Sequence, residues 1–169
     1  MSRLTAMLGR LAAVLSVALA GCDDVERITR VDALVSNLRS RIVPMAAGGL
    51  PTEVHGAPFA GLSAGEVVAR LRLPNGWPAD IGFRAATPAD ASRLVLVFNP
   101  TTAPDGYALC RGVVPPTGAG GEKGFSALAT FCESERPLVT GFLEAPNVRA
   151  DAPEAFAAAM TRLFQQMLD

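Results

Sequence analysis

The sequence predicts an α+β fold: a mostly antiparallel sheet of about five strands, two helices packed on one face, and an amphipathic helix near the N-terminus. Two observations lead to this prediction. Arg93–Phe98 is a short apolar run rich in valine and leucine, and the residues from Asp151 onward carry apolar side chains at helical spacing. No internal repeat is present, and 169 residues are enough for one domain with a substantial core.

Composition excludes some classes of function. Half of the residues are apolar, the formal net charge is −1, and the basic residues are dispersed along the chain. This does not favour a nucleic-acid binder, which must neutralise phosphates. A single histidine leaves little material for a histidine-based metal site, and we expect no cofactor. The three cysteines are an odd number, so one of them needs its own explanation.

The first residues have the layout of a secretory signal. Arg3 and Arg10 give a positive start, residues 11–20 are apolar, and charged residues resume at Asp23. The apolar run is shorter than the roughly 20 residues that span a membrane. We therefore expect residues 1–21 to be a signal peptide that is cleaved.

A short motif, Leu19-Ala20-Gly21-Cys22, ends this segment. It resembles the lipobox of bacterial lipoproteins. The resemblance implies cleavage before Cys22, acylation of its thiol (as by palmitate), and a lipid-anchored protein of the cell envelope that faces the periplasm. Several acyl chains hold a protein firmly where one would be marginal. The alternative is an ordinary signal peptide with a chance cysteine.

Asp23, directly after this cysteine, resembles a membrane-retention signal of enteric lipoproteins and favours the inner membrane over the outer one. Cleavage would remove two of the 15 basic residues and none of the 16 acidic ones, which lowers the net charge from −1 to −3. A polybasic patch is absent, so the lipid would have to provide the membrane anchoring.

We expect residues 22–51 to be the lipidated N-terminus, a helix and a linker. In the stretch 24–42 the apolar residues recur on one helical face. Acidic residues come at its start and arginines at its end, as the helix dipole favours, and Pro44 would stop the helix. This helix could pack on the domain, lie on the lipid surface or pair with a partner. The glycine-containing stretch 45–51 reads as a linker.

The remaining residues, 52–169, are expected to form a single α+β domain. Residues 53–56 suggest a short strand, and Ser63 with Glu66 forms a capping box for a short helix. Residues 81–84 suggest a second strand. Arg93–Phe98 is too apolar for an exposed edge, which favours a central strand.

Three more strands are predicted at 107–114, 125–133 and 138–144, with a glycine-rich turn between the first two. The final helix is expected to be capped by Asp151, with Pro153 in its first turn. Its buried face is predicted to contain Phe156, Met160, Leu163, Phe164 and Met167.

The other two cysteines favour a disulfide. Residue 121, in the glycine-rich turn, is the midpoint between Cys110 and Cys132, so a hairpin would place the two cysteines opposite each other. Such a bridge suits an oxidising compartment and would stabilise the fold by roughly 3 kcal/mol. A reactive redox pair, which usually has Cys-x-x-Cys spacing, and two free buried thiols are the alternatives.

Candidate catalytic residues are few, and we name none as catalytic or metal-binding. Lys123 follows several glycines but lacks the Gly-Lys-Ser/Thr order of a phosphate-binding loop. His55 could form a triad with Ser63 and Asp80, but no Gly-x-Ser-x-Gly motif supports this arrangement.

Short segments from about residue 52 to the end resemble a group of uncharacterised small proteobacterial lipoproteins. The segments are Val54–Gly56, Pro58-Phe59, Phe98–Pro100, Leu109-Cys110, Phe131-Cys132 and Leu138–Gly141. This resemblance implies no activity. We expect a non-enzymatic domain that supports the envelope or binds an envelope or inner-membrane protein. A carrier or auxiliary lipoprotein of a transport system, with an apolar ligand, is the alternative, and a periplasmic hydrolase is a third.

Overall fold

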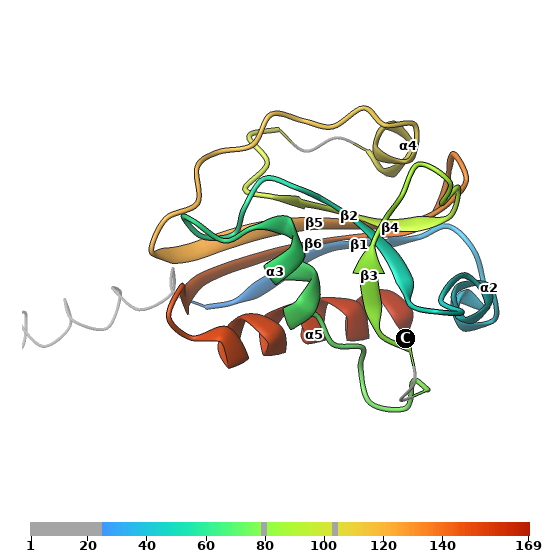
Figure 1. Ribbon diagram of the computed structural model, residues 1–169, viewed down its shortest axis with the longest axis horizontal. Helices are drawn as coiled ribbons and strands as arrows, with labels where there is room; N and C mark the ends of the chain where they lie inside the picture. Colours follow the sequence, from blue (N-terminus) through green and yellow to red (C-terminus); the bar gives the residue numbers. More distant parts are fainter. Residues whose placement is uncertain (1–24, 79–80, 103–104) are drawn as a thin grey trace, which may run out of the picture.

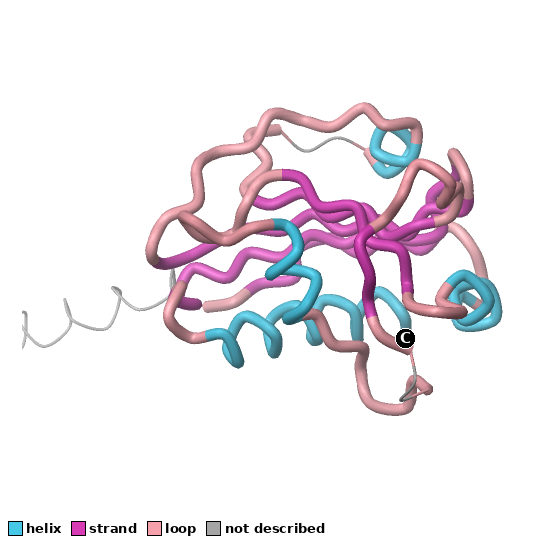
Figure 2. Tube along the Cα trace, viewed as in Figure 1, coloured by secondary structure: helices cyan, strands magenta, loops and turns pink. Residues whose placement is uncertain are grey.

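The computed structural model of the protein describes residues 25–78, 81–102 and 105–169. These residues form a six-stranded mixed sheet and four helices, which confirms the α+β class (Figure 1). The two helices predicted to pack on one face, at residues 64–70 and 153–168, do so, and a further short helix at residues 106–110 lies on the opposite face (Figure 2).

The strands lie across the sheet in the order β1-β6-β5-β4-β2-β3. The β1–β6, β6–β5 and β5–β4 pairs are antiparallel, whereas β2 is parallel to both β4 and β3. The prediction of a mostly antiparallel sheet of about five strands therefore holds for three of the five pairings, but the sheet has six strands and a parallel part that was not expected. The interior position predicted for β4 is confirmed. The strands are β1 (Arg27–Ala33), β2 (Leu50–His55), β3 (Phe83–Ala85), β4 (Arg93–Phe98), β5 (Lys123–Glu133) and β6 (Arg136–Arg149).

Four helices surround this sheet: α2 (Leu38–Met45), α3 (Ala64–Arg70), α4 (Gly106–Cys110) and α5 (Pro153–Leu168). Helices α3 and α5 pack on one face, where β4 contributes Leu94, Leu96 and Phe98. The opposite face contains α4, together with Val95 and Val97 of β4. Alternate residues of one strand thus serve two different layers.

The α5 face contains the main core. All five apolar residues predicted for the helix are buried. The ring centroid of Phe156 lies 5.3 Å from that of Phe125 and 6.0 Å from that of Phe98. Gly141 of β6 lets α5 approach closely, because a Cβ there would lie 2.7 Å from Met167 and 2.9 Å from Leu163.

Local signals explain how two helices begin. The capping box of α3 is present as predicted: the Ser63 hydroxyl accepts from the Glu66 amide, and the Glu66 carboxylate accepts from the Ser63 amide. The prediction that Asp151 caps α5 is wrong. The carboxylate of Asp151 instead accepts two hydrogen bonds from Arg149. The first turn contains Pro153, whose missing N–H costs nothing there, and Glu154, whose charge is favourable near a helix N-terminus.

The predicted helix over 24–42 is wrong for most of its length, because residues 27–33 form β1 and α2 begins only at Leu38. The register of β1 against β6 shifts between Ile28 and Arg30, which leaves Thr29 as an extra residue. Ile28 and Val31 consequently lie on the same face of a strand although they are three residues apart. The bulge thus reproduces the spacing of a helical stripe. Pro44, expected to stop the helix, lies within the last turn of α2.

The first elements belong to the same sheet as the rest. Strand β1 pairs with β6, and β2 begins at Leu50, inside the stretch 45–51 that was expected to be a linker. Leu38 and Ile42 of α2 are buried against the main core. The sheet therefore extends across the boundary expected between residues 51 and 52.

Candidate functional site

The predicted lipidation site cannot be placed, because Cys22, Asp23 and residues 1–21 lie outside the described part of the chain. Lipidation and membrane retention therefore stay predictions. The description begins at Val25, and β1 follows at Arg27. Among the described residues, no helix is long and apolar enough to cross a membrane.

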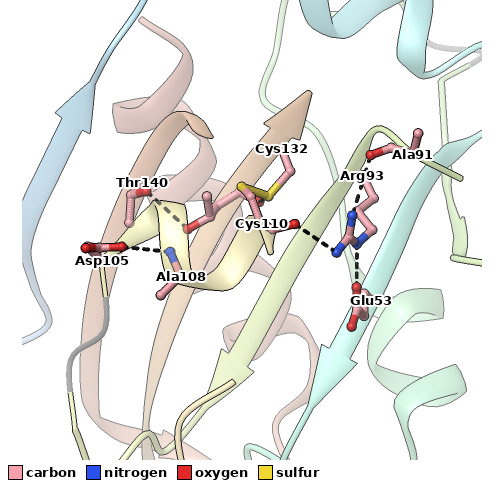
Figure 3. Close-up of a disulfide and its surroundings, with 9 residues drawn as sticks. Glu53, Ala91, Arg93, Asp105, Ala108, Cys110, Cys132 and Thr140 are labelled. Atoms are coloured by element: carbon pink, nitrogen blue, oxygen red, sulfur yellow. Dashed lines mark hydrogen bonds and ion pairs between the residues drawn. A yellow bond between two sulfur atoms is a disulfide. The ribbon is translucent and has the colours of Figure 1, made fainter. Parts of the chain in front are cut away.

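The predicted disulfide between Cys110 and Cys132 is present (Figure 3). The two Cα atoms lie 5.5 Å apart, and both side chains are buried. The hairpin proposed to bring them together is wrong, however, since Cys110 ends helix α4 and Cys132 belongs to β5. The bond therefore ties a helix to the face of the sheet rather than one strand to its neighbour.

Residues 105–113, which we call the α4 platform, have local signals at both ends. The Asp105 carboxylate accepts a hydrogen bond of 2.7 Å from the Ala108 amide and caps the helix. At the other end, Gly112 has φ +80°, its amide donates to Leu109, and the Val113 amide donates to Ala108. This is the Schellman pattern of helix termination. The predicted strand over 107–114 is therefore wrong, because Asp105 begins a helix and Gly112 ends it.

The platform lies very close to β6. At Gly106, an added Cβ would overlap the Thr140 hydroxyl and lie 3.0 Å from Pro137. Beneath it, the buried hydroxyls of Thr130 and Thr140 lie 3.1 Å apart and satisfy each other. An isolated helix of five residues would not persist in water. Close packing and the disulfide therefore hold α4 in place.

A charged cluster on β2 and β4 adjoins the disulfide (Figure 3). The Arg93 guanidinium donates to one oxygen of Glu53, and the other oxygen lies 2.7 Å from His55 Nε2. A second nitrogen of Arg93 donates to the Cys110 carbonyl at 3.4 Å. Arg93 therefore links the Glu53 carboxylate to the last turn of α4, where a positive charge is favourable.

The electrostatics of this cluster favour an ionised Glu53. Burial raises the pKa of Glu53, but hydrogen bonds from Arg93 and His55 outweigh it, so that the pKa lies below its usual range. Glu53 and Arg93 line an open hollow of about 480 Å³ together with the loop 86–91. In that loop, hydrogen bonds from Arg84 and Thr87 hold the pKa of Asp90 well below its ordinary value.

These contacts do not bring His55 and Ser63 together as a hydrolase would require. His55 contacts Glu53, whereas the Ser63 hydroxyl donates to Glu66 at 2.6 Å within the capping box. Asp80, the third candidate, lies outside the described residues. Across the described ranges, no group of three or more His, Cys, Asp or Glu side chains is arranged to hold a metal ion.

The glycine-rich segment before Lys123 has a packing role. A Cβ at Gly120 would lie 2.6 Å from the backbone of Phe59, and Gly121 forms a bridge with the same residue. Lys123 itself is the first residue of β5. The segment therefore connects α4 to β5 and is not the hairpin turn that was expected.

The outer surface of the α4 platform is apolar in two places. Tyr107 is 45% exposed and Val113 is 61% exposed. Both residues belong to the helix and cap that the disulfide holds against the sheet. The sequence prediction did not identify this surface, because an alternating strand would have buried half of the stretch. The combination of Asp105 and Gly112 as helix caps is the signal that could have revealed it.

Comparisons of the chain with protein-family models, with curated proteins and with solved structures gave no match.

Proposed function

We propose that the chain is a membrane-anchored periplasmic lipoprotein without enzymatic activity, and that its domain binds an envelope protein through the α4 platform. One observation carries the second part of this proposal. Tyr107 in α4 and Val113 in the cap that follows it present apolar surface, and the disulfide bonds this helix covalently to the sheet. A surface that is already ordered loses little conformational entropy on binding, which favours association with a partner.

The tether between anchor and domain is short. Strand β1 begins five residues after Cys22, and five extended residues span at most about 18 Å. An acylated Cys22 would therefore keep the domain at the membrane surface. A partner that meets the α4 platform would then be a membrane protein or a protein held near the same membrane.

The carrier alternative has less support. An apolar ligand would need space between the sheet and α5, the usual site for such a pocket in a fold of this kind. That layer is filled by phenylalanine side chains, among them Phe59, Phe98, Phe125 and Phe156, with ring centroids 5.3–6.1 Å apart. The surface of α4 is therefore the better candidate for recognition.

The anchor is tested by acylation. Cells that produce the full chain and its Cys22→Ala variant are labelled with a palmitate analogue, and their membranes are separated from the soluble fraction. We expect label and membrane association only with Cys22 present. A Cys110→Ala/Cys132→Ala double variant is the matched control and should keep the label. Label on the Cys22→Ala variant would overturn the anchor proposal.

Partner binding is tested with a photo-crosslinking amino acid at position 107 in the full chain. The matched control carries it at the exposed Glu135, in the turn between β5 and β6. We expect one discrete adduct from position 107 that is absent from position 135 and weakened at least severalfold by Val113→Asp. Equal adducts from both positions, or none from position 107, would count against the α4 platform as a binding surface.

A further inference from the structure

The two edges of the sheet differ in length and exposure. On one side, the edge strand β3 has only three residues, and the Ala86 amide just after it continues the pairing by donating to Thr52 of β2. On the other side, β1 has seven residues, five of them exposed. Val31 within this strand is 39% exposed, and Leu34 just beyond it is 50% exposed. Among the described strands, none pairs with the outer side of β1, and a long edge of this kind that carries apolar side chains is a template for another strand.

The outward backbone groups of β1 follow from its register. Leu34 donates to the Leu138 carbonyl of β6, and the same register pairs Ala33 with Val139 and Val31 with Gly141. Antiparallel ladders alternate between residues that bond to the partner strand and residues that do not. The N–H and C=O groups of Val31 and Ala33 therefore point to the open edge.

The side chains of β1 complement those of a second β1. Arg30 and Asp32 lie on either side of Val31, on the same face of the sheet, and form an ion pair within the strand. If two copies pair antiparallel about Val31, Val31 faces its own copy, and each Arg30 faces the other chain's Asp32. Opposite charges across strands are favourable, whereas like charges are not. We propose that two copies of this chain associate through this β1–β1 pairing.

A second copy would also cover an open hollow at this edge. Val31 and Ala33 line a space of about 370 Å³ beside Met167, near the end of α5. The added strand would lie against its open side and bury Val31 from solvent. The arrangement is isologous, since the same patch is used by both copies, and it therefore closes at two chains. It does not require acylation of Cys22 or a partner on the α4 platform.

The test uses complementary charge reversal in the full chain. Copies with two different C-terminal tags are produced together and solubilised in mild detergent, and retention of one through the other is measured. Arg30→Asp paired with itself places like charges opposite each other, as does Asp32→Arg with itself. We expect retention to fall by about tenfold or more in both cases. Arg30→Asp paired with Asp32→Arg restores opposite charges and should return to the wild-type level.

This rescue separates the proposal from a loss of folding, which mixing two variants would not repair. Unchanged retention in either self-pairing, or failure of the mixed pair to recover, would overturn the proposal. A second measurement uses Val31→Cys, which places two thiols at the dyad, with Glu135→Cys as control. Mild oxidation of membranes should give a crosslinked dimer for Val31→Cys alone. Equal crosslinking of both variants, or none with Val31→Cys, would also overturn the proposal.

Discussion

The two faces of the sheet are held together by different interactions. On the α5 face, a helix of 16 residues buries six apolar side chains against aromatic rings and aliphatic side chains. On the α4 face, a helix of five residues is held by a disulfide, a close glycine contact and a hydrogen bond from Arg93. The first layer is stabilised mainly by the large apolar area it buries, and the second by a smaller apolar cluster around Leu109 together with these specific contacts.

We infer from this difference that the α5 face mainly stabilises the fold, whereas the outer surface of α4 is available for recognition. Side chains on the α5 face are fully enclosed, so their size and shape are constrained by packing. The outward side chains of α4 contribute little to the contacts that hold the helix. They can therefore vary with the needs of a partner, while the disulfide keeps the backbone in place.

The largest expected effect concerns the α5 face. Phe156→Ala removes a ring that contacts three other phenylalanines, and we expect a loss of about 3–5 kcal/mol in the free energy of unfolding. Phe142→Ala is the matched control, because Phe142 is only partly buried and lies on the α4 face. Urea unfolding measures both variants. An equal loss from both would show that the two faces do not differ in this way.

Loss of the disulfide should act mainly on the α4 face. The bond joins residues 22 positions apart, so the Cys110→Ser/Cys132→Ser double variant should lose roughly 3 kcal/mol. Hydrogen exchange should show lost protection at the amide of Gly112, whose acceptor lies in α4, with protection retained in α5. Uniform loss of protection throughout the domain would instead show that the two faces unfold together.

A smaller effect is expected at the contact between α4 and β6. Gly106→Ala forces a methyl group against Thr140 and Pro137, which should cost about 1–3 kcal/mol. Gly65→Ala is the matched control, because it lies in α3 with open space around its Cα. That variant should be neutral or slightly stabilising. Thermal unfolding of both proteins compares them, and equal destabilisation would contradict the close approach of α4.

The smallest effect is a pH dependence at the charged cluster. The pKa of Glu53 is lowered in the folded protein, so its contribution to stability is present above the unfolded value of 4.5 and is lost as the pH falls through the folded value. Wild type should therefore exceed Glu53→Gln in urea midpoint at pH 7, and the difference should shrink toward pH 3. A difference that grows on acidification would show the opposite sign of the shift.

Much of the α5 face could be predicted from the sequence. Its helix carries five apolar residues at regular spacing, and β4 is a continuous apolar run, so both patterns are strong and local. The α4 face was harder to predict. A five-residue helix has too few turns to show periodicity, and its position depends on contacts with Thr140 and Cys132 that are distant along the chain.

Of the candidate sites, the disulfide could be predicted from the sequence, whereas the charged cluster could not. Pairing of Cys110 with Cys132 followed from cysteine count and compartment, although the predicted hairpin geometry was wrong. The link between Glu53 and Arg93 joins residues 40 positions apart, and it depends on the parallel pairing of β2 with β4. No spacing rule along the chain could reveal that contact.

The sequence by itself determined the α+β class, the central strand, the capping box at Ser63, the buried face of the last helix and the choice of disulfide partners. The tertiary structure decided that residues 27–33 form an edge strand, that the sheet has a parallel part, and that α4 covers the second face. The physical reason is the range of the interactions. Caps and apolar periodicity act within a few residues, whereas strand pairing, the Thr29 bulge and the contact at Gly106 depend on which distant segments meet.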